Sequence, residues 1–122
     1  MALHIDAKQM KTMSDAMRVR FELDSMAMLR QTYPEFTARH VDETLHRFVR
    51  HGIERAKLSN MTTVAEIERW LRLMMQLGPY FDTAGDDGLD HIRTVIHKVD
   101  IYGPIRLDEA EAMALRIAPA PK

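Results

Sequence analysis

The chain has 122 residues, a net charge of −1, 46% hydrophobic residues and 29% charged residues. This balance is typical of a globular domain and excludes a disordered segment, and the near-zero charge gives no general attraction to nucleic acid or anionic membranes. Cysteine is absent, which excludes disulfides and thiolate chemistry. The first residues lack a secretory signal pattern, and no apolar run approaches the roughly 20 residues of a membrane span, so we expect a cytoplasmic protein.

Composition also predicts the fold class. Strong helix formers dominate, whereas Gly and Pro number only 5 each and aromatics make up 7%, which disfavours a many-stranded sheet. We therefore predict an all-α fold, a compact bundle of four to five helices that forms a single domain over residues 1–122, with 118–122 as a frayed tail.

Two helices are predicted in the first half of the chain. The first runs from the region of Asp6 to residue 32 and is stopped by Pro34. Three apolar residues lie off its main apolar stripe and give it a second face that could meet a partner: Val19, Leu23 and Met26. The second helix covers residues 41–58, and Gly52 inside it indicates close approach of a neighbouring helix.

The second half contains three more predicted helices. Thr63 and Glu66 match a capping box that begins a helix, which Gly78 and Pro79 end. After a polar loop over 80–88, a fourth helix is expected over 89–99, with Val99 among its inward residues. Gly103 and Pro104 then break the chain, and Asp108 caps a last helix that ends near residue 117.

Residue patterns for metal sites and catalysis are incomplete. Glu43 and His46 have the Glu-x-x-His spacing of a di-iron ligand pair, but the second copy that such a site needs is missing. A calcium loop counted from Asp82 has Asp87 and Arg93 at its sixth and twelfth positions, where glycine and glutamate are required. No nucleophile elbow is present either, although a triad assembled in space cannot be judged from sequence distance. We expect no enzyme activity, no metal and no cofactor.

Arginines and methionines are the remaining unusual features. The arginines of residues 39–72 could form a basic face for nucleic acid, but acidic residues are interleaved with them at helical spacing, as on a solvated helix. The ten methionines suit either core packing or an adaptable binding groove, and core packing is the favoured interpretation.

Three segments resemble a bacterial family: FVRHGIERA at 48–56, TTVAEIERWLRLM at 62–74 and LGPYFD at 77–82. They are similar to small helical accessory proteins encoded beside spike, PAAR-tip and toxin genes of type VI secretion systems. The likeness covers roughly residues 5–82, and the Pro and Trp element with which family members continue is missing after Asp82. The resemblance implies an adaptor or chaperone-like role for a secreted effector, toxin or spike component in a Gram-negative cytoplasm, without enzyme activity.

Our hypothesis is a non-enzymatic protein-binding accessory. It would use the second face of the first helix together with the turn after the third, and the expected partner-binding residues are Val19, Leu23, Met26, Arg72, Tyr80, Phe81 and Asp82. The partner is a protein, not a nucleic acid or a membrane, and self-association is left open. The alternative is an immunity protein that neutralises a cognate toxin, followed by a regulator that binds nucleic acid.

Overall fold

The computed structural model describes residues 15–83 and 88–117. Within these ranges the protein is an all-α bundle, which confirms the predicted fold class. Its helices are α2 (Asp15–Thr32), α3 (Pro34–Thr37), α4 (Asp42–Leu58), α5 (Val64–Leu77), α6 (Asp90–Ile96) and α7 (Gly103–Ile117). The predicted beginning of the first helix, Asp87 of the calcium-loop pattern and the tail over 118–122 lie outside the described residues.

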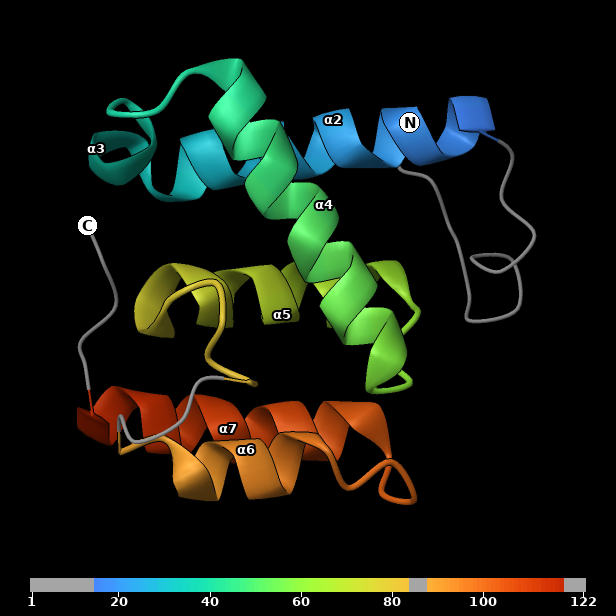
Figure 1. The fold of residues 1–122 in the computed structure, drawn as a ribbon, viewed down its shortest axis with the longest axis vertical. Helices are drawn as coiled ribbons and strands as arrows, with labels where there is room; N and C mark the ends of the chain where they lie inside the picture. The colour runs from blue at the N-terminus through green and yellow to red at the C-terminus, as the bar shows by residue number, and fades with distance from the viewer. Residues whose placement is uncertain (1–14, 84–87, 118–122) are drawn as a thin grey trace.

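The helices are stacked in layers along the long axis of the molecule, and most of them lie across that axis, as Figure 1 shows. α2 and α3 lie at one end, α6 and α7 lie side by side at the other, and α5 lies between them. α4 begins beside α2 and crosses the bundle until its last turn comes down toward the connection between α6 and α7. The core joins these layers, and its largest fully buried apolar side chains are Trp70, Phe81, Leu29, Met61, Ile67, Leu71, Leu73, Met74, Ile92, Ile96 and Leu107.

Proline has two effects at the junction of α2 with α4. Pro34 ends α2 as predicted, but it also occupies the first turn of α3, a short helix that we did not predict. Proline suits this position because the first turn of a helix needs no hydrogen bond from its N–H. Arg30 holds the junction by donating to the carbonyl oxygens of Thr37 (3.0 Å) and His40 (3.1 Å) and to the carboxylate of Asp42 (2.7 Å).

The connection from α4 to α5 follows the local sequence signals. Asn60 has a positive φ of 60°, a conformation that asparagine tolerates at the end of a helix. The predicted capping box is present, because the Thr63 hydroxyl accepts from the Glu66 N–H and the Glu66 carboxylate accepts from the Thr63 N–H. These bonds satisfy amides at the start of α5 that have no partner inside the helix.

Gly52 lies where α4 crosses α5. A Cβ atom at this position would overlap Leu71 Cδ2 and lie 2.7 Å from Met74 Sδ, so the predicted close approach is confirmed. Gly52→Ala should lower the free energy of unfolding by up to about 2 kcal/mol, because an overpacking cost of roughly 1–3 kcal/mol opposes a gain in helix propensity of about 1 kcal/mol. Urea denaturation measures this change, and a variant more stable than the parent would contradict the packing described here.

The last two helices differ from the predicted bounds. α6 ends at Ile96, so Val99 is 53% exposed instead of buried. Gly103 and Pro104 begin α7 instead of breaking the chain, since proline in a first turn starts a helix as readily as it stops a preceding one. Asp108, predicted as a cap, therefore lies inside α7 and accepts a 2.6 Å hydrogen bond from Arg69 of α5, which also pairs with Glu111.

Candidate protein-docking surface

Of the three residues predicted on the second face of α2, two are exposed and one is buried. Val19 and Leu23 are about half exposed, at 48% and 50%, so this helix does present apolar side chains to solvent. Met26 is buried and belongs to the core, which corrects its expected place on that face. The reason is geometric: Met26 lies at the edge of the arc that packs inward together with Phe21 and Leu29.

The residues predicted around the turn after α5 also differ in exposure, some lying on the surface and others in the core. Tyr80 is exposed, and its ring meets His51 edge-on with 4.7 Å between ring centroids. Phe81 was expected beside it on the surface but is only 1% exposed, because its ring packs against Trp70 at 5.1 Å. Arg72 is half-exposed on α5, 4.0 Å from Glu68. A single turn thus sends one aromatic ring outward and the next inward.

Asp82 is also buried, which corrects its expected surface role. Its side chain has no exposed area and accepts hydrogen bonds from Arg55 of α4, at 2.9 Å from Nε and 2.8 Å from Nη2. The other oxygen, Oδ1, has no partner among the described residues. A buried carboxylate held by one arginine ties the turn to α4, so we assign Asp82 a structural role.

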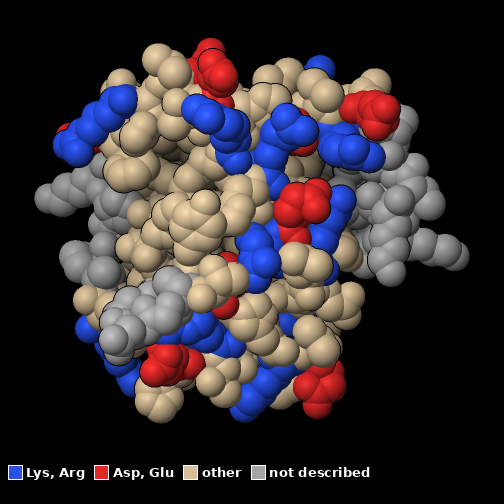
Figure 2. All heavy atoms as spheres, in the orientation of Figure 1, with Lys and Arg blue, Asp and Glu red and all other residues tan. Residues whose placement is uncertain are grey.

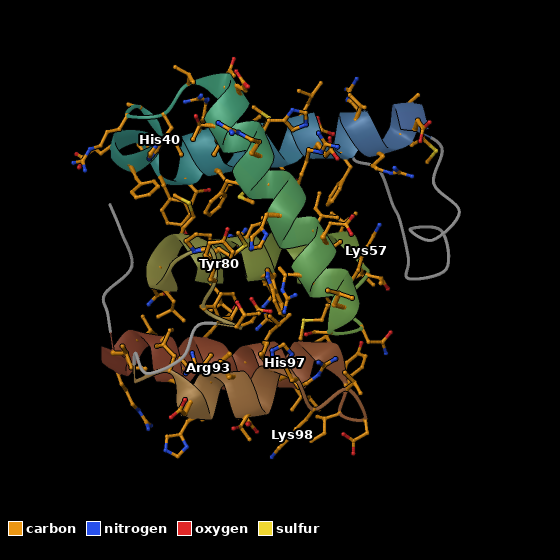
Figure 3. The ribbon with its side chains drawn as sticks, in the orientation of Figure 1. His40, Lys57, Tyr80, Arg93, His97 and Lys98 are labelled. Carbon is orange, nitrogen blue, oxygen red and sulfur yellow. The ribbon has the colours of Figure 1, made fainter. Side chains whose placement is uncertain are left out.

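Beside this pair, the fold brings together the residue types of a hydrolytic triad. His97 Nε2 lies 2.8 Å from the carbonyl oxygen of Asp82 and 3.8 Å from its carboxylate, and Nδ1 lies 2.8 Å from Ser59 Oγ. Because a carbonyl oxygen only accepts, Nε2 carries the proton in the neutral ring and the Ser59 hydroxyl donates to Nδ1. Figure 3 labels His97 at the level of α6 and α7.

The exposure of these groups argues against nucleophilic catalysis. Ser59 has no exposed area, whereas a nucleophile has to reach the reacting atom of its substrate. His97 itself is partly exposed, so solvent meets the ring but not the hydroxyl. The three residues follow the ends of α4, α5 and α6, and their hydrogen bonds fasten those ends to one another.

The histidine of the incomplete di-iron pattern has a different partner. His46 Nε2 lies 2.7 Å from the carboxylate of Glu22, a buried residue of α2, while Glu43 is exposed. Among the residues that the structure describes, no group of three or more His, Cys, Asp or Glu side chains is placed to hold a metal ion. His46 instead satisfies a carboxylate buried between α2 and α4.

Exposed apolar side chains gather along the connection between α6 and α7 and the first turn of α7, a segment that we call the apolar turn. Its members are exposed by 39–71%, with Tyr102 the most exposed, and are Val99, Ile101, Tyr102 and Ile105. In Figure 1 this connection projects at the lower right, next to the last turn of α4. Four large apolar side chains within seven residues of chain form the kind of patch that marks a protein contact.

Arg106 fixes the apolar turn from inside. This side chain is 2% exposed and donates to three carbonyl oxygens: Ile101 at 2.8 Å, Ser59 at 2.9 Å and Ile96 at 2.6 Å. Burial lowers the pKa of its guanidinium, and the nearby carboxylates of Glu66 and Asp100 oppose that change. Because the three carbonyls belong to the ends of α4 and α6 and to the turn itself, one side chain sets the position of all of them.

A pocket of about 280 Å³ opens beside the apolar turn. Its walls are the segment between α4 and α5, the N-terminal turn of α5 and the connection before α7, through Asn60, Thr62, Thr63, Glu66, Val99, Asp100, Ile101, Tyr102, Gly103 and Arg106. Gly103 is required here, since a Cβ atom would overlap Glu66 Oε2. The turn therefore combines exposed apolar side chains with a hollow whose walls also include the charged side chains of Glu66 and Arg106.

Sequence reasoning missed the apolar turn for two reasons. Val99 was assigned to the buried face of a longer helix, and Tyr102 stands next to a Gly-Pro pair that was interpreted as a break. One signal was available, because four apolar residues crowd around that pair without the period of a helix or a strand. Arg106 had no comparable signal, since its carbonyl partners include residues 47 and 10 positions away in the chain.

The remaining surface is mixed in charge. Figure 2 shows lysines and arginines interspersed with acidic residues over the face in view, without a large area of one sign. None of the helices in the described ranges combines the length and apolar character of a membrane span. Comparisons with protein-family models, with curated proteins and with solved structures gave no match to this chain.

Proposed function

We propose that this chain is a non-enzymatic accessory protein that binds another protein through the apolar turn. The observation that carries the proposal is the apolar turn itself: side chains exposed by up to 71% on a segment that the buried Arg106 holds in place. Exposed apolar groups on a rigid support lose little conformational entropy on binding, which favours a docking role over an incidental exposure.

The class of partner comes from the sequence resemblance. It supports a type VI secretion effector, toxin or spike component as the bound protein, with this chain acting as its adaptor or chaperone in the cytoplasm. The three segments that carry the likeness build α4, α5 and the turn after α5, so they supply the scaffold and not the apolar turn. The structure therefore supports the contact surface, and the resemblance supports the class of partner.

Co-expression with each effector, toxin and spike protein encoded beside the native gene tests this function. We expect one of them to form a stable complex that survives size-exclusion chromatography, with this chain promoting its solubility. Complex formation with a toxin, together with rescue of cells from that toxin, would favour the immunity role over the adaptor role. Failure of every neighbouring protein to bind would overturn the proposal.

Surface variants identify the contact. Tyr102→Glu in the apolar turn should weaken the complex by about 100-fold, since an anchor aromatic at an interface contributes roughly 2 kcal/mol or more. Leu23→Glu on α2 is the matched control, because Leu23 is an exposed apolar residue too and was predicted to bind the partner. If Leu23→Glu abolishes binding and Tyr102→Glu does not, the docking surface is the α2 face.

A further inference from the structure

The pocket beside the apolar turn contains two polar side chains whose hydrogen-bonding capacity is only partly used. Glu66 and Arg106 both line it and are 8% and 2% exposed. Glu66 Oε1 accepts from the N–H groups of Thr62 and Thr63 and from the Thr63 hydroxyl, but Oε2 accepts no hydrogen bond from any described residue. Half of a nearly buried carboxylate thus remains available to the pocket.

Arg106 is in the same situation. Its Nε and Nη1 atoms donate to the three carbonyls that hold the turn, while Nη2 donates to none of the described residues. Arg106 Nη2 and Glu66 Oε2 each keep some solvent-accessible area, and both residues line the pocket. The two groups form no ion pair with each other, although each influences the other electrostatically.

The free atoms define the chemistry of an occupant. Glu66 Oε2 requires a donor, and Arg106 Nη2 requires an acceptor. An anion does not fit well, because the carboxylates of Glu66 and Asp100 outnumber the single guanidinium in the walls. A peptide group fits, since it is neutral and offers one N–H and one C=O. The volume of about 280 Å³ is large enough for a short piece of extended chain.

We propose that this pocket binds the main chain of an extended peptide segment from the partner protein, with the N–H of one residue donating to Glu66 Oε2 and a carbonyl oxygen accepting from Arg106 Nη2. Apolar side chains of the same segment then pack on Tyr102 and Ile105 at the rim. This inference rests on the proposed protein-binding function and names the element that is bound. It explains why an arginine that already holds the turn, and a glutamate that already caps α5, both face one hollow.

The probe is a random linear peptide library displayed on phage and selected against the full chain. We expect peptides with two or three apolar residues, and replacement of one backbone amide by an ester should weaken the best peptide about tenfold or more, because the ester lacks the N–H that reaches a charged acceptor. Glu66→Gln should weaken the all-amide peptide similarly but show no further loss with the ester. The glutamine keeps the oxygen that caps α5, which circular dichroism and thermal unfolding verify.

Leu115→Gln is the control, because Leu115 is 67% exposed on α7 and takes no part in the pocket. It should bind the selected peptide as tightly as the parent protein. If no peptide is selected, or if the selected peptides bind Glu66→Gln as tightly as the parent, the inference is wrong. A natural partner that requires Tyr102 but is insensitive to Glu66→Gln would overturn the pocket inference and leave the docking function standing.

Discussion

Replacing Arg106 with methionine should lower the free energy of unfolding by about 3–5 kcal/mol. We expect no larger effect from any other single substitution of a buried residue in α7. Methionine fills similar space but leaves three carbonyl oxygens without their donor, each at a cost of roughly 1–3 kcal/mol, and removal of a buried charge offsets part of the sum. Chemical denaturation followed by circular dichroism measures the change.

Arg116→Met on the same helix is the matched control. Arg116 is exposed, so its replacement should change stability by less than about 0.5 kcal/mol. Arg106→Lys should recover part of the lost stability, because an ammonium group still donates hydrogen bonds. The recovery should be incomplete, because the ammonium group reaches fewer of the three carbonyls than the planar guanidinium does. If Arg106→Met were as stable as the Arg116 control, Arg106 would not be the residue that holds the apolar turn.

Replacing Arg55 with methionine should cost about 3–5 kcal/mol, because it leaves the carboxylate of Asp82 buried without its counter-charge. The reverse change, Asp82→Ala, should cost less, since the Arg55 side chain is 26% exposed and can turn toward water. The comparison of the two variants and their double mutant in one denaturation series gives the coupling between them. If the two single variants lost equal amounts of stability, the difference in burial between Arg55 and Asp82 would not determine the cost of breaking the pair.

Local signals predicted the parts of this fold whose physics is local. Thr63 and Glu66 form the capping box, and Asn60 takes its left-handed conformation, through contacts that span four residues or fewer. Gly52 was also interpreted correctly, because a glycine inside a strong helix pattern has few explanations other than close packing. The capping box and the Asn60 conformation depend on chain neighbours, whereas at Gly52 the sequence indicated a close approach without naming the Leu71 and Met74 side chains that make it.

The parts that depend on distant contacts were not predictable in the same way. Phe81 and Asp82 stand in a polar segment, yet Trp70 and Arg55 draw both of them inward. Gly103 and Pro104 can end one helix or begin the next, and only the packing of α7 on α5 and α6 decides between these outcomes. The apolar turn followed from that decision, and of its residues only Val99 was predicted, as an inward residue of a longer helix.

The most direct test is the affinity of the partner protein found by co-expression for Tyr102→Glu compared with Leu23→Glu, measured by isothermal titration on variants of verified stability. Both substitutions place a negative charge at an exposed apolar position, one in the apolar turn and the other on α2. We predict a loss of about 100-fold for Tyr102→Glu and little change for Leu23→Glu. Undiminished binding by Tyr102→Glu would contradict the assignment of the apolar turn as the docking surface.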